Sequence, residues 1–270
     1  MVVGIIESRC VLVLGATSGI GRSLALALHD LPSKPTVIVG GRRQERLDEL
    51  AKTSDRIKGV QVDVTAGREA LRGFVKDTLA TYPDLDAVIF SSGIQLEFDF
   101  NHPEQVDLDA LENELTTNYT SIVTLITLFL PHFLKLNEQG RPSFIIPVSS
   151  ALSIVPAPWV PNYAATKAAI HSLSISLGAQ FRETNIRVLE VIPPLVESEL
   201  HDHQGTTPAL SRVWMPLSEF TEKAMAGLVK GNSQIPVGFA AANWEVFEKG
   251  KEEKALQSYQ HTLQLHKELK

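Results

Sequence analysis

The sequence predicts an α/β fold made of one domain, in which a doubly wound parallel sheet of about seven strands has helices on both faces. Two observations predict it. Short apolar runs alternate along the chain with amphipathic stretches of helical period, without an internal repeat or a low-complexity segment. No linker rich in proline, glycine or serine divides the 270 residues, and 44% of them are hydrophobic, which is enough for one sizeable core.

The strands are expected at the short apolar runs, and helices fill the intervals between them. These runs lie near residues 10–14, 36–40, 59–62, 87–91, 143–148, 187–192 and 235–238. Residues 1–270 are therefore expected to form a single domain that holds both the binding and the catalytic groups.

A lid is expected near residues 195–216, after the sixth strand. Within it, Glu199 to Pro216 has no clear periodicity, as is typical of a segment that covers a substrate. The run His201-Asp202-His203 also invites a metal site. Two histidines in a flexible loop are more often solvated than ligands, so no metal is expected there and the lid interpretation is kept.

A helical extension is expected near residues 243–270. It spaces Trp244, Phe247, Ala255, Tyr259 and Leu263 at helical intervals among lysines and glutamates, which gives a partly apolar stripe. The stripe either covers the protein's own sheet edge, which we favour, or docks a partner. In the first case it would block the edge used for tetramers.

Charge and cysteine content exclude several classes of protein. The net charge is −6 and both signs are spread along the chain, so there is no basic stripe for DNA or RNA. The single cysteine, Cys10, rules out an intrachain disulfide and lies in the first apolar run, where a buried inert thiol is expected. A reducing, cytoplasmic compartment is compatible with this composition.

Neither of two apolar segments predicts export or a membrane anchor. The segment Met1–Ile6 is interrupted by Glu7 and Arg9 before it reaches the length of a signal core. The apolar stretch Ile122–Leu134 is too short to span a bilayer and contains a proline and a histidine, so a buried or interface helix is expected.

A glycine turn follows the first predicted strand. Gly15, Gly19 and Gly21 lie in the run Gly-Ala-Thr-Ser-Gly-Ile-Gly, and a helix-favouring stretch comes next. Gly15 permits the tight turn, Gly19 lets the backbone approach a pyrophosphate, and Gly21 allows close packing of helix on strand. The amides at the start of the helix would point at the anion. This context predicts a Rossmann-type nucleotide site.

Two arginines follow the second predicted strand, where a dinucleotide site distinguishes NAD from NADP. An acidic residue there would select NAD, whereas this chain has Arg42 and Arg43, which can hold a 2′-phosphate through charge-assisted hydrogen bonds. NADP(H) is therefore the expected cofactor, with Arg42 the stronger candidate. The alternative is that both arginines merely begin the next helix and are solvated.

A tyrosine and a lysine four residues apart share one face of a predicted helix. Tyr163 and Lys167 lie one turn apart, and a neighbouring ammonium would lower the pKa of the phenol toward neutral pH, where it could exchange a proton with an alcohol or carbonyl. Ser150 ends the strand near 143–148 and could donate to a carbonyl oxygen. Taken alone, the pair could be a lysine packed along a buried tyrosine, and the serine an ordinary turn residue.

Together these positions resemble the short-chain dehydrogenase/reductase family from about Val11 to Ser198. The resemblance implies that Tyr163 is the acid/base, that Ser150 orients the carbonyl, and that Lys167 holds the nicotinamide ribose. It further implies that Asn118 supports a water-linked proton path. It implies cofactor contacts from Gly15, Thr17, Ser18, Gly19, Ile20, Gly21, Arg42, Arg43, Asp63, Val64, Ser92, Gly93, Tyr163, Lys167, Pro193, Val196 and Ser198.

The chain departs from the family pattern at several framing positions. Leu14 stands in place of a threonine before the first glycine, and Phe90 and Ser91 replace two asparagines of the Asn-Asn-Ala-Gly element. Pro194 occupies the glycine position of the Pro-Gly element, and Ser198 stands where a threonine often meets the carboxamide. None of these changes removes a reacting group, so an altered frame around an intact reaction centre is expected.

The sequence thus predicts an NADPH-dependent oxidoreductase that reduces a ketone or aldehyde to an alcohol. An apolar substrate is favoured because Val155–Val160, between Ser150 and Tyr163, could wall an apolar pocket. In the family, the helix from Ile122 and the helix of Tyr163 form the usual dimer contact, which implies a homodimer. Two alternatives are a non-redox isomerase, dehydratase or epimerase on the same fold and a non-catalytic NADPH-binding protein.

Overall fold

The computed structural model describes residues 3–268. Six parallel strands form the central sheet in the order β3-β2-β1-β4-β5-β6. Their bounds are β1 Cys10–Leu14, β2 Thr36–Gly41, β3 Ile57–Gln61, β4 Ala87–Phe90, β5 Ser143–Pro147 and β6 Ile186–Val188. The order reverses between β1 and β4, so the carboxyl ends of these two strands are where a doubly wound sheet binds ligands.

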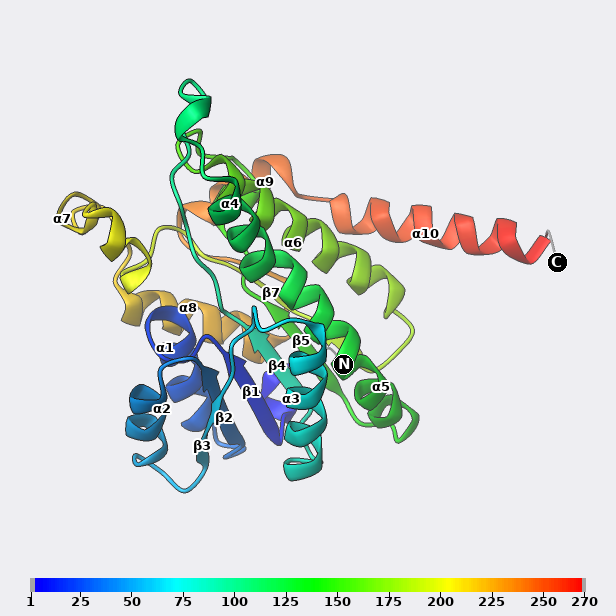
Figure 1. Ribbon diagram of the computed structural model, residues 1–270. Coiled ribbons are helices and arrows are strands. Elements are labelled where there is room, and N and C mark those ends of the chain that lie inside the picture. The colour runs from blue at the N-terminus through cyan, green and yellow to red at the C-terminus, as the bar shows by residue number, and fades with distance from the viewer. Residues whose placement is uncertain (1–2, 269–270) are drawn as a thin grey trace.

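Helices cover both faces of the sheet, as the alternation of the sequence predicts (Figure 1). On one face, α1 (Gly19–His29), α2 (Gln44–Ala51) and α8 (Leu217–Lys230) pack against alternate strand residues such as Val11 and Val39. On the other face, α3 (Arg68–Thr81), α5 (Ser121–Glu138) and α6 (Pro161–Gln180) pack against residues such as Leu12 and Ile145. Every residue of β1, β4 and β5 is buried, which is why these strands read as continuous apolar runs.

The predicted strand near 187–192 is two segments. It breaks at Leu189 into β6 (Ile186–Val188), which pairs with β5, and β7 (Glu190–Ile192), which pairs with β8 (Gln234–Pro236) in a separate two-stranded sheet. β7 nevertheless stays joined to the end of β5: Val148 bridges Val191, and the Ser149 amide donates to the Val191 carbonyl at 2.9 Å. Val191 of β7 and Ile235 of β8 belong to the same buried cluster as Val11 of β1, so the small sheet packs on the core of the central one.

A long helical run precedes β5 and contains a local widening. It comprises α4 (Leu108–Leu115), a π-helical turn at Thr116–Thr120 and α5. By length and mean hydropathy, the run Leu108–Glu138 qualifies as a candidate membrane span. Its apolar face is nevertheless occupied by the sheet and by α3, because residues such as Leu125 and Phe129 lie in the core. It is the core helix of an α/β layer.

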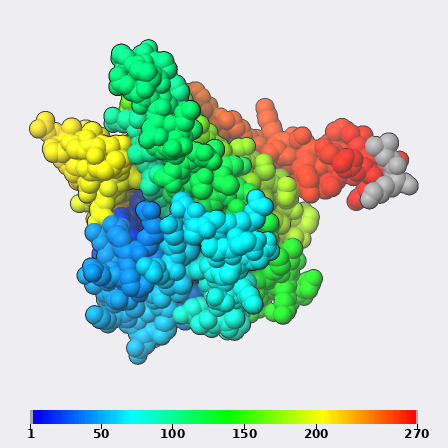
Figure 2. Space-filling view, viewed as in Figure 1, coloured from blue at the N-terminus to red at the C-terminus, as the bar shows by residue number. Residues whose placement is uncertain are grey.

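The C-terminal extension is two helices, where the sequence predicted one from residue 243. These are α9 (Phe239–Phe247) and α10 (Lys251–Glu268), separated at Gly250, whose φ of 85° lies in the left-handed region that ends helices. The predicted range runs to residue 270, and its last two residues lie outside the described ones. The shorter α9 contacts β8, whereas α10 packs its first turns on α6. Beyond them α10 projects from the body (Figures 1 and 2).

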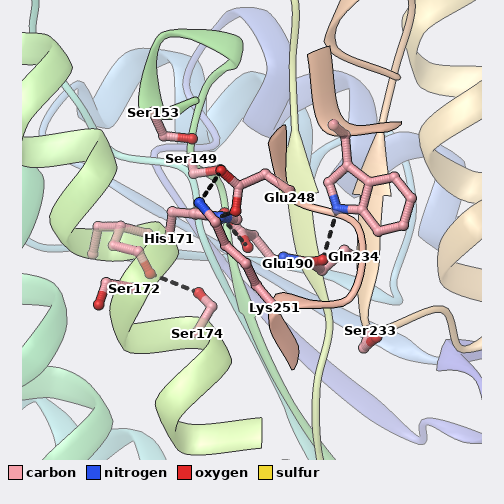
Figure 3. Close-up of polar contacts among 12 residues, drawn as sticks. Ser149, Ser153, His171, Ser172, Ser174, Glu190, Ser233, Gln234, Glu248 and Lys251 are labelled. Carbon is pink, nitrogen blue, oxygen red and sulfur yellow. Dashed lines mark hydrogen bonds and ion pairs between the residues drawn. The ribbon is translucent and has the colours of Figure 1, made fainter. Parts of the chain in front are cut away.

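A buried ion cluster fixes the start of this extension to the core (Figure 3). His171, on α6, lies between two carboxylates: Nδ1 is 2.9 Å from Glu190 Oε2 and Nε2 is 2.9 Å from Glu248 Oε2. Lys251 pairs with the second oxygen of Glu248 at 2.6 Å. The cluster therefore joins α6, β7 and the junction between α9 and α10.

Candidate active site

A cavity of about 900 Å³ opens at the carboxyl edge of the central sheet. It is bounded by the glycine turn after β1, by the ends of β4 and β5, and by the segment after β7, whose η5 turn (Glu199–Gln204) and α7 (Thr207–Leu210) reach over it. In Figure 2 the segment around residues 200–215, in yellow, stands above the blue N-terminal part of the molecule. Of the sequence-predicted site residues, all but Asn118 line this cavity: Gly15, Thr17, Ser18, Gly19, Ile20, Gly21, Arg42, Arg43, Asp63, Val64, Ser92, Gly93, Ser150, Tyr163, Lys167, Pro193, Val196 and Ser198.

The glycine turn has the geometry of a phosphate cradle. Gly15 has φ 79°, and a Cβ there would lie 2.6 Å from the Ser92 backbone nitrogen. A Cβ at Gly21 would lie 2.3 Å from the Gly15 carbonyl oxygen. Both positions must therefore be glycine for α1 to begin beside β4, with its first amides free to bind an anion.

We expect Gly21→Ala to abolish nucleotide binding and to lower the free energy of unfolding, since the added methyl would push α1 away from the turn. Gly73→Ala is the matched control, because Gly73 lies exposed within α3 and an added Cβ meets nothing within 4 Å. There alanine should stabilise the helix by ~0.5–1 kcal/mol. Denaturation midpoints and nucleotide fluorescence titrations test both, and normal binding by Gly21→Ala would contradict this account of the turn.

An arginine cluster lies beside the glycine turn. Arg43 donates from Nη2 to Thr17 Oγ1 and Ser18 Oγ, both at 2.7 Å. Its Nη1 donates to Glu199 Oε2 at 2.7 Å, and Arg46 donates to Glu199 Oε1 at 2.6 Å. Arg46 and Glu199 were not predicted as site residues. Both lie in charged, exposed stretches, and only the fold brings the segment after β7 to the start of α2.

Two other predicted cofactor contacts, Arg42 and Asp63, follow the neighbouring strands β2 and β3. Arg42 and Asp63 line the cavity, and Asp63 Oδ1 accepts from both the amide and the hydroxyl of Thr65 at 2.9 and 2.8 Å. These hydrogen bonds, helped by the charge of Arg42, lower the pKa of the Asp63 carboxyl. The carboxylate thus stays ionised and orders the turn after β3.

The tyrosine and lysine lie together on α6, and both are buried. The Lys167 ammonium is 5.6 Å from the centre of the Tyr163 ring and donates to the Val148 carbonyl at 2.9 Å. The expectation that the pKa of Tyr163 lies below its ordinary value is wrong for this structure. Burial raises the pKa of the phenol to about 12, against a lowering effect of the adjacent Ser150 hydroxyl, while burial lowers the pKa of Lys167 to about 8.

Ser150 and Asn118 are fixed by different local structures. Ser150 caps the η4 turn (Ala151–Ser153), with its hydroxyl accepting from the Leu152 amide at 3.1 Å. Asn118 lies within the π-helical turn and is fully buried, with its side chain exchanging two hydrogen bonds with the Ile94 backbone, both 2.9 Å long. Its amide also donates to Thr166 at 3.2 Å. Asn118 therefore joins the segment after β4 to the tyrosine helix.

A buried carboxylate missed by the sequence reasoning supports the same helix. Glu114, on α4, accepts from the Leu96 amide at 2.8 Å and from the Asn162 side chain at 2.6 Å. Burial raises the pKa of Glu114 against these hydrogen bonds. Because Asn162 immediately precedes Tyr163, this contact fixes the first turn of α6.

The positions that depart from the family pattern are accommodated by packing and by local hydrogen bonds. Leu14 and Phe90 are both buried within the core cluster beneath α3, α5 and α6. The Pro193 carbonyl accepts from the Ala151 amide at 2.7 Å, which joins the proline turn to the η4 turn that Ser150 caps. Ser198 caps η5, accepting from the Leu200 amide at 3.4 Å. Packing and hydrogen bonds at the altered positions thus still hold together the segments that surround the cavity.

The expected apolar wall between Ser150 and Tyr163 is only partly correct. Within Val155–Val160, Trp159 lines the cavity, whereas Ala157 and Val160 are buried behind Tyr163, and Val155 faces solvent. Most of the rest of the cavity wall comes from segments far from Val155–Val160 in the sequence, which only the fold brings together. These further lining residues are Ile94, Gln95, Leu152, His201, Gln204, Leu210, Val213 and Phe239.

Comparison with known proteins assigns the chain to a family. The family model described as short chain dehydrogenase matches residues 9–209. The chain belongs to the short-chain dehydrogenase family. It is 34% identical over 229 residues to the uncharacterized oxidoreductase DltE of Bacillus subtilis, covering 84% of this chain and 87% of that protein. It is 28% identical to the 3-oxoacyl-[acyl-carrier-protein] reductase FabG of Thermotoga maritima, covering 80% of this chain and 85% of that protein.

Solved structures of the family have the same fold. A short-chain dehydrogenase from Sphingobium yanoikuyae in complex with NADPH matches with a TM-score of 0.76 at 23% identity, covering 95% of this chain and 94% of that one. A serine dehydrogenase complexed with NADP⁺ matches with a TM-score of 0.72 at 25% identity, covering 81% of this chain and 88% of that one. Both of these proteins were solved with a nicotinamide cofactor bound, and the likeness supports the parallel α/β fold of this chain.

The residues around the cavity fit such a cofactor. At Gly15 and Gly21 a Cβ would clash with the protein's own backbone, so the glycine turn is closely packed and presents no side chain at these positions to a pyrophosphate. At the other end, a Cβ at Gly93 would lie 3.3 Å from Asn118 Oδ1 and 3.7 Å from the Lys167 ammonium, so this position too is kept open beside the reacting groups. One elongated space therefore connects an anion cradle to a tyrosine.

Proposed function

We propose that this protein is an NADPH-dependent carbonyl reductase, which reduces a ketone or aldehyde to an alcohol. The observation that carries the proposal is the placement of Ser150, Tyr163 and Lys167 along the same 900 Å³ cavity as the glycine turn and the arginines after β2. Family membership supports oxidoreductase chemistry, and the arginine cluster supports NADP(H) over NAD(H).

Each residue has a distinct part in this mechanism. The bound nicotinamide would supply the hydride, with the glycine turn, Lys167 and Ser198 holding the cofactor. Tyr163 donates the proton to the carbonyl oxygen as negative charge develops on it, and Ser150 orients that oxygen by hydrogen bonding. The raised pKa of Tyr163 keeps its phenol protonated at neutral pH, which suits an acid in the direction of reduction.

We propose an apolar substrate, a homodimer and a cytoplasmic location. The substrate end of the cavity is lined by Ile94, Leu152, Trp159, Val213 and Phe239, which favours burial of a hydrophobic or aromatic group next to the carbonyl. The lid over that end is the segment from residue 195 to residue 216.

Absorbance of the reduced nicotinamide tests the function directly. The protein is mixed with NADPH or NADH and with a panel of aromatic and aliphatic ketones and aldehydes. Oxidation of NADPH that requires a carbonyl supports the proposal. Tight nucleotide binding without oxidation across the panel would contradict it and favour a non-redox reaction on the same fold or a non-catalytic nucleotide-binding protein.

Replacing the arginines should separate the two nucleotides. We expect Arg42→Gln and Arg43→Gln each to weaken NADPH binding by ~10- to 100-fold, because a charge-assisted hydrogen bond contributes ~1.5–3 kcal/mol. NADH binding should change little. Arg72→Gln, on the exposed surface of α3, is the control. Fluorescence titration measures all four proteins, and equal losses for NADPH and NADH would mean that the arginines only shape the turn.

A further inference from the structure

The carboxylate of Glu199 occupies the arginine cluster. It accepts from Arg43 Nη1 at 2.7 Å and from Arg46 Nη1 at 2.6 Å, one oxygen on each guanidinium. Glu199 begins the η5 turn, so this contact joins the segment after β7 to the first turns of α2. The two ends of the contact are 153 and 156 residues apart in the sequence.

The same cluster has the donors that a 2′-phosphate would need. Besides Glu199, Arg43 donates to the hydroxyls of Thr17 and Ser18 in the glycine turn, so its guanidinium is held at the mouth of the cradle. A phosphate on the adenosine ribose that is held by these arginines would accept from the guanidinium edges that Glu199 uses. An anion and a carboxylate cannot share these donors without like-charge repulsion.

The ion pairs between Glu199 and the two arginines are exposed and weak, so a competing anion can replace the carboxylate. The arginine and glutamate side chains are between 40% and 44% exposed, and exposed ion pairs are weak. Burial tends to raise the pKa of Glu199, but its hydrogen bonds to Arg43 and Arg46 lower the pKa overall. Glu199 therefore stays ionised at neutral pH and remains a competitor there.

We propose that Glu199 is a specificity-determining residue, an internal competitor that occupies Arg43 and Arg46 until the 2′-phosphate of NADP(H) displaces it. This inference rests on the proposed use of NADP(H). Displacement of Glu199 releases the first residue of η5, the turn that carries His201 and Gln204 onto the cavity. Binding of the 2′-phosphate thus frees this end of the lid. NADH, which lacks the phosphate, leaves Glu199 paired with the two arginines.

The test compares Glu199→Gln with Glu197→Gln by nucleotide binding, without turnover. Glu197 lies two residues away on the same segment, but its carboxylate accepts from the Leu217 amide at 3.2 Å. Dissociation constants are measured by fluorescence for NADPH and NADH, and by competition for adenosine 2′,5′-bisphosphate and ADP. We expect Glu199→Gln to tighten NADPH and the 2′,5′-bisphosphate several-fold, up to ~10-fold, with NADH and ADP unchanged. Glu197→Gln should alter none of them.

A second background shows whether the effect passes through the arginines. In the double variant Arg43→Gln/Arg46→Gln, adding Glu199→Gln should no longer change the ratio of NADPH to NADH affinity. Equal changes for both nucleotides in the single variant, or weaker NADPH binding, would overturn the role of Glu199 and make it a residue that only shapes the turn.

The proposed cofactor preference and the role of Glu199 fail separately. The ratio of NADPH to NADH affinity in the unmodified protein tests the preference for NADPH. The change in that ratio on Glu199→Gln tests the role of Glu199 as a competitor. An unmodified protein that binds NADPH and NADH equally, together with a Glu199→Gln variant that prefers NADPH, would contradict the first and support the second. If the unmodified protein prefers NADPH and Glu199→Gln does not change the ratio, the cofactor preference is supported and the role of Glu199 is contradicted.

Discussion

Tyr163→Phe is expected to lower kcat by ~10²- to 10⁴-fold, the range that a positioned general acid contributes, while leaving nucleotide binding intact. Phenylalanine keeps the ring that packs with Ala157 and Val160 and removes only the hydroxyl. The loss should therefore fall on the chemical step. It is measured as carbonyl-dependent NADPH oxidation under saturating nucleotide, with the dissociation constant of NADPH determined in parallel.

The control for this variant is Tyr259→Phe. Tyr259 is half-buried on α10, away from the residues that line the cavity, so its hydroxyl has no place in the reaction. Its substitution should leave kcat unchanged. If Tyr163→Phe retained nearly full activity, the proton would have to come from another group, and the proposed role of the tyrosine would be wrong.

The middle of the central sheet was predictable because β2, β1, β4 and β5 are buried almost throughout. Such strands must be continuous apolar runs, and the runs at 10–14, 36–40 and 87–91 match β1, β2 and β4 to within one residue. The glycine turn was predictable for a related reason, since Gly15 and Gly21 sit where any Cβ would clash with backbone. In both cases the local geometry restricts the side chains that fit: apolar ones in the buried strands and none in the turn.

The corrections arise where tertiary contacts decide. Leu189 is apolar and buried like a strand residue, yet the chain changes partners there, from β5 to β8, so one predicted strand becomes two. The helical spacing after Asn243 continues across Gly250, but its positive φ ends the first helix. Burial raises the pKa of Tyr163. The spacing of Tyr163 and Lys167 does not indicate that distant segments bury this face of the helix.

Groups of opposite charge from distant segments were the least predictable part of the site. Arg46 and Glu199 each look like solvated surface residues in the sequence, and their pairing depends on how the segment after β7 folds back. The same holds for His171, which lies in a helix of weak amphipathic character and finds Glu190 and Glu248 only in the folded chain. Local patterns carry no signal for such contacts.

The stability of the protein is expected to fall as pH rises from about 6.5 to about 9, because of His171. Burial opposes ionisation of this imidazole, but Glu190 and Glu248 outweigh it and raise the pKa of His171 from 6.5 to about 9. A group whose folded pKa is raised contributes its full stability below the unfolded value and loses it as pH rises through the folded value. The contribution is of order ~3 kcal/mol, since one pKa unit corresponds to ~1.4 kcal/mol.

Removing the imidazole should lower the free energy of unfolding directly. His171→Leu leaves Glu190 and Glu248, which are almost entirely inaccessible to solvent, without their shared cation, and breaking a buried pair in this way costs ~3–5 kcal/mol. His266→Leu, on the exposed last turn of α10, is the control and should cost little. Urea unfolding at pH 6, 7.5 and 9 measures all three proteins. In His171→Leu the decline between pH 6.5 and 9 should disappear, because the imidazole whose pKa is raised into that window is gone. A decline equal to that of the unmodified protein would show that the imidazole is not the group that titrates.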